Sequence, residues 1–170
     1  MTSETTQQAT MSSEPQKEHR WLQRLVGEWT FESEASMGPD QPPEKVSGTE
    51  SVRALGGLWI IGAGEGEMPG GGSHRSVLTL GYDPDKKRFV GSFISSMMPS
   101  FWVYEGELDA GSNVLTLNTE GPSMAGDGTM AKYQETIELL SDDHRVFKSR
   151  VLGEDGDWQE FMSMSYRRTR

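Results

Sequence analysis

The chain has 170 residues, a formal net charge of −10 and no cysteine. This length suffices for one good hydrophobic core and is too short for two ordinary domains. The acidic balance argues against binding to nucleic acid or to an anionic membrane surface. The lack of cysteine excludes disulfides and thiolate metal sites, and no apolar run is long enough to span a bilayer, so we expect a cytoplasmic protein.

The N-terminal part of the chain predicts a disordered leader followed by one helix. Residues 1–14 lack both a basic start and an apolar run, which argues against a secretory signal and favours disorder. Within residues 15–26, apolar side chains at helical spacing predict a short amphipathic helix. Gly27 ends this helix, which we expect to plug or flank the mouth of the structure that follows.

Ten short runs of alternating apolar and polar residues follow, and each predicts a strand. Clusters such as Asp83-Pro84-Asp85 separate them, so the connections are short and strands that are consecutive in sequence should pair. No helical pattern interrupts the series, which argues against parallel crossovers. The predicted strands cover residues 28–36, 46–55, 58–66, 75–82, 88–95, 101–108, 114–120, 130–140, 145–153 and 157–168.

These runs predict an all-β fold, an antiparallel up-and-down barrel of about ten strands with a short N-terminal helix. Closing the sheet on itself removes its exposed edges. We expect residues 15–170 to form this barrel as a single domain. About eight strands make a barrel that side chains just fill, so ten strands should leave a lumen.

Strand alternation predicts which side chains share a face. Gly62, Gly64 and Gly66 recur with a period of two, so one face of their strand should be bare. In the last predicted strand, Phe161 should lie on the face opposite to a row of alternate residues. That row consists of Trp158, Glu160, Met162, Met164 and Tyr166.

The segment Leu25-Val26-Gly27-Glu28-Trp29 resembles the opening of calycin barrels, the group that contains lipocalins and fatty-acid-binding proteins. In that group the Gly-x-Trp motif begins the first strand, and its tryptophan closes the barrel floor. An arginine late in the lipocalin barrel stacks on the motif tryptophan. The resemblance therefore implies that Arg167 or Arg168 packs over Trp29.

Further segments are similar to one bacterial family of calycin-like proteins that is known only as a domain of unknown function. They include Gly56-Gly57-Leu58-Trp59, the run from Thr79 to Pro84 and the run from Trp102 to Leu108. The resemblance covers about residues 17–168. It implies the barrel fold and transfers no catalytic residue.

The histidines predict no metal site, and we expect no cofactor. His19, His74 and His144 are far apart in the sequence, so no local metal-binding pair exists. His144 raises one alternative, because ten-stranded barrels that resemble nitrobindin hold haem through a single histidine. Its neighbours Asp142 and Asp143 favour a polar turn instead.

The leading hypothesis is a calycin-like protein that binds a small, mostly apolar molecule in the barrel lumen. Aromatic and methionine side chains on several strands supply apolar surface, and an apolar cavity with a few polar tips is the usual form of a small-molecule site. The candidate ligand-binding residues are Trp59, Trp102, Tyr104, Met124, Tyr133 and Met162.

Three alternatives stay open. The first is a cofactor-free isomerase, cyclase or hydrolase in which Tyr104, Glu105 or Glu135 acts as acid or base. Alternation turns Glu105 away from the face of Tyr104, so at most one of these two points into the lumen. The others are haem binding through His144 and a protein-interaction module with an acidic outer face around a solid barrel. The sequence predicts no oligomeric state.

Overall fold

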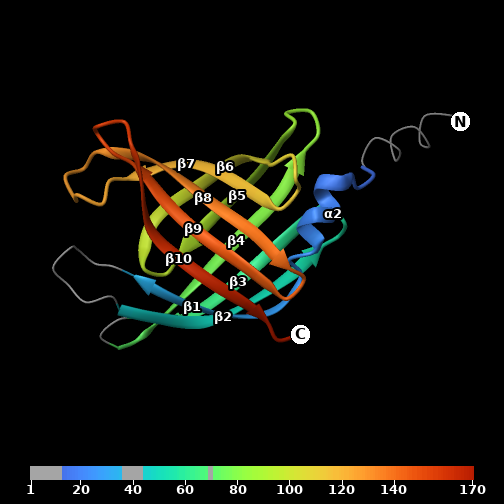
Figure 1. Cartoon of the computed structure of the whole chain (residues 1–170), viewed down its shortest axis with the longest axis horizontal. Coiled ribbons are helices and arrows are strands. Elements are labelled where there is room, and N and C mark those ends of the chain that lie inside the picture. Colours follow the sequence, from blue (N-terminus) through green and yellow to red (C-terminus); the bar gives the residue numbers. More distant parts are fainter. Residues whose placement is uncertain (1–12, 36–43, 69–70) are drawn as a thin grey trace, which may run out of the picture.

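The computed structural model describes residues 13–35, 44–68 and 71–170, which form one short helix and ten strands (Figure 1). The helix, α2, covers Lys17–Gln23. The strands are β1 (Gly27–Ala35), β2 (Glu44–Leu55), β3 (Trp59–Glu67), β4 (Ser73–Asp83), β5 (Arg88–Ser95), β6 (Met98–Leu108), β7 (Val114–Pro122), β8 (Met130–Ser141), β9 (His144–Leu152) and β10 (Trp158–Arg168).

Each strand pairs antiparallel with its neighbours in sequence, and β1 also pairs with β10 to close the barrel. This topology confirms the predicted all-β, up-and-down barrel of ten strands with a short helix before it. Because successive side chains on a strand point to opposite faces, every second residue of each strand points into the barrel. The described residues include no helix that is both long and apolar enough to cross a membrane.

The observed elements differ from the predicted ones mainly at their ends. The helix is shorter than residues 15–26, because Arg24, Leu25 and Val26 form tight turns in which each N–H donates to the carbonyl three residues earlier. Several strands begin earlier than predicted because the ladders continue further towards the hairpin turns. The predicted end of the first strand, at residue 36, lies outside the described residues.

Helix α2 covers one end of the barrel, which we call the helix end (Figure 1). Trp21 and Leu22 on the helix and Leu25 just after it are at most 4% exposed. They belong to one apolar cluster with inward side chains that include Ile60 and Leu80. Because large apolar groups from helix and strands fill this end together, it is a solid core.

His19 fixes the helix to β4. Its Nδ1 accepts a hydrogen bond from the Gln16 N–H at 2.9 Å, so Nε2 carries the proton and donates to the Tyr82 carbonyl at 3.0 Å. On the same helix, Trp21 Nε1 donates to the carbonyl of Ser112 at 2.7 Å. These buried polar atoms are therefore satisfied, and they hold α2 over β4 and the β6–β7 connection.

Trp29 on β1 closes the barrel floor together with Arg168, the last residue of β10. The Arg168 Cζ lies 4.2 Å from the centre of the Trp29 ring, and Trp29 is 1% exposed. The indole Nε1 donates to the Leu25 carbonyl at 2.9 Å. The stacking of a late arginine on the motif tryptophan is thus confirmed, and the residue that stacks is Arg168.

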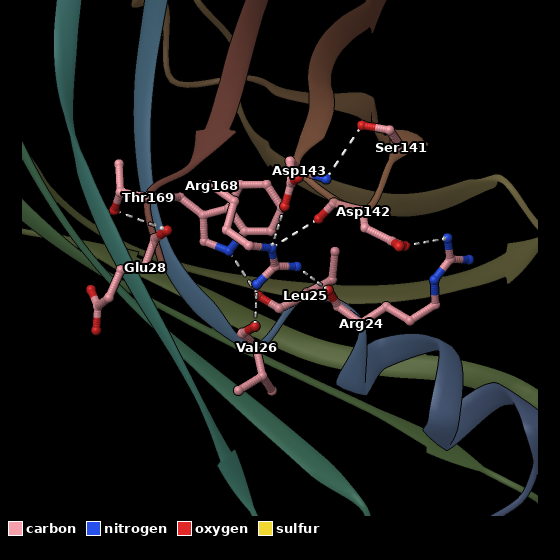
Figure 2. A network of polar contacts seen from close by, with 10 residues as sticks. Arg24, Leu25, Val26, Glu28, Ser141, Asp142, Asp143, Arg168 and Thr169 are labelled. Atoms are coloured by element: carbon pink, nitrogen blue, oxygen red, sulfur yellow. Dashed lines mark hydrogen bonds and ion pairs between the residues drawn. The ribbon is translucent and has the colours of Figure 1, made fainter.

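The Arg168 guanidinium also joins segments that are distant in the sequence (Figure 2). Its nitrogens donate to the carbonyl oxygens of Arg24 at 2.7 Å, Val26 at 2.5 Å and Asp142 at 2.8 Å. A planar guanidinium presents several donors in fixed directions, which an ammonium group cannot do. Arg168 therefore ties the end of β10 to the chain after α2 and to the β8–β9 turn.

Gly27, the first residue of the Gly-x-Trp motif, makes room for this arginine. A Cβ at position 27 would lie 2.2 Å from Nη1 of Arg168 and 2.6 Å from the carbonyl oxygen of Arg170. The φ of Gly27 is +146°, a conformation that residues with side chains rarely adopt. The motif thus has a structural reason, because only a residue without a side chain at position 27 leaves space for the guanidinium that covers Trp29.

A β-bulge in β10 corrects the predicted faces of this strand. The pairing with β9 shifts between Glu160 and Met162, which leaves Phe161 as an extra residue. The prediction that Trp158 and Glu160 share the face of Met162 is therefore wrong. Trp158 lies beside the exposed Arg150 on the outer face, and Phe161 joins the inward aromatic side chains.

Replacing Arg168 with alanine should lower the free energy of unfolding by about 3 kcal/mol, because three charge-assisted hydrogen bonds and the stack on Trp29 are lost together. Arg168→Lys keeps the positive charge and loses the planar set of donors, so it should recover only a small part of this loss. Urea unfolding followed by tryptophan fluorescence measures both effects.

The matched control is Arg167→Ala, since Arg167 is exposed on the outer face. It should change the free energy of unfolding by no more than about 0.5 kcal/mol. An Arg168→Lys variant as stable as the unmodified protein would contradict the role given to the guanidinium.

Candidate functional site in the barrel interior

The inward side chains differ in exposure between the two ends of the barrel. Near the helix end, Leu80 and Leu115 are 0% exposed. Further from α2, the inward side chains of Phe93, Trp102 and Met162 stay partly exposed although the sheet is closed. Solvent reaches a side chain inside a closed barrel only through the interior. This half, which we call the upper half, is therefore partly open to solvent.

A buried ion pair crosses the interior from β9 to β2. Arg145 and Glu50 form a salt bridge, with side chains that are 3% and 9% exposed. The Arg145 Cζ lies 3.9 Å from the centre of the Tyr166 ring and 4.7 Å from that of Trp29. Removing two charges from water costs several kcal/mol, and the pairing and the two ring contacts oppose this cost, while Arg145 Nε is buried without a hydrogen-bond partner among the described residues. The two charges cancel, so they leave no net charge here.

The bare face of β3 makes room for polar groups. A Cβ on Gly62 would lie 3.0 Å from a carboxylate oxygen of Glu50, and one on Gly66 would lie 2.7 Å from His74 Cε1 and 3.1 Å from Phe31. The predicted bare face therefore points into the barrel. His74 Nδ1 is buried there, and no described protein group hydrogen-bonds to it.

Glu135 on β8 places a second carboxylate in the interior. Its partners in the ladders are Leu117 on β7 and Ser149 on β9. Its Oε2 is buried and has no hydrogen-bond partner among the described protein groups. Burial raises the pKa of Glu135 to about 7, and a hydrogen bond with Ser149 opposes the rise. The carboxyl is therefore close to half-ionised at neutral pH.

Two tyrosines share this part of the interior with Glu135. Burial, together with the charge of Glu135, raises the pKa of Tyr104. The pKa of Tyr166 is raised chiefly by burial, then by Glu50 and more weakly by Glu135, while Arg145 opposes the rise. Both phenols therefore stay neutral at physiological pH, and neither adds a charge beside the Glu135 carboxylate.

An aromatic wall lies next to Glu135 in the upper half. The Trp102 and Tyr133 rings meet edge to face with centres 5.2 Å apart, and Phe161 lies 6.0 Å from Tyr133 in the same manner. Tyr133 precedes Glu135 by two residues on β8, so both point inward. Thr119, which pairs with Tyr133, has a buried hydroxyl oxygen that forms no hydrogen bond within the described parts of the chain. The wall thus combines apolar faces with unpaired polar atoms.

Most of the predicted ligand-binding residues meet in this interior, and two do not. Trp59 is 39% exposed on the outer face, where its ring lies over Gly81. Met124 is 61% exposed in the β7–β8 connection. The residues that point into the barrel are Trp102, Tyr104, Tyr133 and Met162.

The other residues considered for chemistry lie outside the interior. Glu105 points outward, as alternation predicted, and its carboxylate is 3.9 Å from Lys86 Nζ. On the outer face, His144 Nε2 and Ser165 Oγ lie 2.9 Å apart, and burial, with the charge of Arg167, lowers the pKa of His144. In the parts of the chain that the structure describes, no group of three or more histidine, aspartate or glutamate side chains could hold a metal ion.

Two surface hollows are separate from the upper half. One, of about 540 Å³, is lined largely by polar residues of β1, β2 and β10, such as Thr30 and Glu32. The other, of about 550 Å³, lies beside α2, and its lining residues include Lys17 on the helix and Ser112 in the β6–β7 connection. The inward aromatic wall lines neither of them.

Sequence reasoning named Glu135 as a candidate acid or base and missed several other polar groups of the interior. Glu50, Arg145 and Ser149 all lie in predicted strands, but nothing in their residue types indicates burial. Strand alternation was a usable signal, because Glu50 lies two residues before the buried Val52 and therefore on the same face of the strand. Polar residues at inward positions could have been placed inside the barrel by this rule.

A family model described as "Protein of unknown function (DUF1579)" matches residues 14–168. No curated protein matches the chain. Rv2717c from M. tuberculosis has a similar structure, with a TM-score of 0.61 and 13% identity over 92% of this chain and 100% of that one. The S-type phycobiliprotein lyase CPES from Guillardia theta gives a TM-score of 0.59 and 16% identity over 92% and 99% of the two chains. At these identities the likeness shows the barrel fold alone.

Glu135→Gln should change how stability depends on pH. The folded-state pKa of about 7 exceeds the ordinary value of 4.5, so folding favours the protonated carboxyl. The associated stability is fully present below about pH 4.5 and is lost as the pH rises through 7. The variant should therefore be more stable than the unmodified protein above pH 7, by up to about 3 kcal/mol, and equal to it near pH 4.5.

Urea unfolding at a series of pH values measures this difference. Glu138→Gln is the matched control, because Glu138 lies on the same strand and points outward. It should leave the pH dependence unchanged. Parallel stability curves for Glu135→Gln and the unmodified protein would show that burial does not perturb this carboxyl.

Proposed function

The chain belongs to the family described as Protein of unknown function (DUF1579), and we propose that its barrel binds one small, mostly apolar molecule in the upper half of the interior. The observation that carries this proposal is the partial exposure of inward apolar side chains such as Trp102 and Met162. A barrel filled for stability alone would bury them as completely as Leu80 at the helix end.

The energetics favour an apolar occupant. Apolar surface that stays in contact with water forgoes about 25 cal/mol of stabilisation for every Å². A ligand that covers this surface recovers the stabilisation without any rearrangement of the sheet. A mostly apolar cavity with a few polar groups is also the common form of a small-molecule site.

The proposed contact residues are the inward members of the predicted set. Trp102 and Tyr133 offer rigid rings, and Met162 offers a flexible thioether that adapts to the shape of a ligand. Tyr104 lies deeper and is 3% exposed. Trp59 and Met124 are outside the proposed site, because Trp59 lies on the outer face and Met124 lies in the exposed β7–β8 connection.

We further propose that the protein is calycin-like and acts in the bacterial cytoplasm. The calycin-like assignment is supported by the closure of the barrel floor through Trp29 and Arg168. The cytoplasmic setting is a prediction from the absence of cysteine and the acidic composition. The lyase named among the similar structures shares 16% identity with this chain, so its activity is not part of the proposal.

A cofactor-free enzyme is the second candidate, and one observation favours it. Glu135 has a pKa of about 7 in the interior near Tyr104, which suits general acid–base chemistry. Glu105 plays no part in it, since its carboxylate lies outside beside Lys86. A turnover assay with any ligand that the barrel retains would distinguish an enzyme from a binding protein.

The two remaining alternatives have weaker support. His144 lies at the outer face beside Ser165, away from the interior where a haem would need its ligand. The interaction module requires a solid barrel, whereas inward side chains such as Phe93 are partly exposed. We therefore do not include either alternative in the proposal.

Trp102→Ala should weaken the binding of the neutral dye N-phenyl-1-naphthylamine about tenfold, because a large buried aromatic contact is lost. Fluorescence titration of the dye at neutral pH measures the dissociation constant. The control is Phe101→Ala on the same strand, since Phe101 is 66% exposed on the outer face.

The control should leave the dissociation constant within about twofold of that of the unmodified protein. If Trp102→Ala binds the dye as tightly as the unmodified protein does, Trp102 is not part of the site. If Phe101→Ala weakens binding and Trp102→Ala does not, the dye binds on the outer face and the proposed location is wrong.

A further inference from the structure

We propose that the ligand of this barrel carries a positively charged nitrogen, such as an ammonium group on an apolar body, and that Glu135 binds that nitrogen. The inference rests on the proposed function and adds the chemical class of the ligand. It is carried by the arrangement of charges and rings in the upper half of the interior.

The described inward carboxylates differ in their partners. Glu50 is paired with Arg145, and this pair is buried beneath the Tyr166 and Trp29 rings. Glu135 has no cationic partner among the described residues, and its Oε2 is buried without a hydrogen-bond donor. A buried carboxylate oxygen without a donor is costly, so a ligand that supplies an N–H donor gains more here than an apolar group does.

The groups around Glu135 leave it as the centre of negative charge in this half. The phenols of Tyr104 and Tyr166 face it, and their raised pKa values keep them neutral. From β9, Ser149 hydrogen-bonds to the carboxylate, and from β7, Leu117 packs beside it. On β8 itself, the neighbours on the same face are Tyr133 and Ile137. The other inward titratable groups named here are the paired Glu50 and Arg145 and, on β4, His74.

The aromatic wall favours the same kind of ligand. Trp102, Tyr133 and Phe161 meet edge to face and line the upper half beside Glu135. Faces of aromatic rings attract cations, and desolvation in an interior strengthens this attraction. The rings contact the apolar body of the ligand, and the carboxylate binds its charged end. Together they favour an amine over a neutral molecule of the same size.

Protonation of Glu135 gives the inference a pH signature. Below pH 7 the carboxyl becomes neutral and its attraction for a cation falls, whereas above pH 7 it is ionised. The affinity for an amine that stays protonated should therefore rise about tenfold between about pH 6 and about pH 8. The affinity for a neutral molecule of the same shape should stay constant.

Two naphthalene derivatives of equal size test this inference with the full-length protein. 1-Naphthylmethylamine carries an ammonium group, and 1-naphthylmethanol carries a hydroxyl group at the same place. Isothermal titration calorimetry at about pH 6 and about pH 8 gives both affinities. We expect the amine to bind at least about tenfold more tightly than the alcohol at the higher pH.

Glu135→Gln should remove this preference and its pH dependence, and it should leave binding of the alcohol within about twofold. Glu138→Gln, which changes a carboxylate on the outer face of the same strand, should preserve both. If the variant at position 135 fails to fold, the pH dependence of the unmodified protein decides the question alone.

The outcomes separate the two proposals. Alcohol and amine that bind equally at both pH values would overturn the assignment of a cationic ligand and leave the binding function standing. Failure of both probes to bind would overturn the binding function and the inference with it. A preference for the amine that survives in Glu135→Gln would overturn the role of this carboxylate.

Discussion

Trp29 lies between two guanidinium groups, with Arg145 Cζ at 4.7 Å and Arg168 Cζ at 4.2 Å from its ring centre. Arg168 donates to carbonyls of distant segments, and Arg145 reaches across β10 and β1 to Glu50. These contacts span the place where β1 meets β10, which is where a sheet must close to become a barrel. An open sheet would expose two strand edges. The shape of the interior therefore depends on this stack.

The closed barrel has two halves with different chemistry. At the helix end, α2 supplies Trp21, Leu22 and other large side chains that complete a dry core. Away from it, Gly66 on β3 leaves room for His74, and the inward rings stay partly exposed. The helix end stabilises the fold, so the upper half is free to carry polar atoms that a core would exclude. This division is the physical basis of the proposed binding site.

The sequence predicted the ten strands and the helix because alternation and turn residues are local signals, and the resemblance to calycin barrels implied the stack on Trp29. Alternation also placed Tyr104 and Glu105 on opposite faces. The predicted face of Trp158 was wrong, because the β-bulge depends on the pairing of β10 with β9 and has no signature in the sequence of β10. Sequence reasoning did not find the pairing of Glu50 with Arg145, since residues so far apart meet only when the barrel closes.

The central claim is that a small apolar molecule enters the upper half of the interior. The most direct test is a titration of ¹⁵N-labelled protein with the neutral 1-naphthylmethanol, followed by amide chemical shifts. The account predicts that the largest shifts belong to inward residues of β6, β8 and β10, among them Trp102, Tyr133 and Met162. Shifts confined to the surface hollows, around Thr30 or Ser112, would place the binding site outside the barrel and contradict the account.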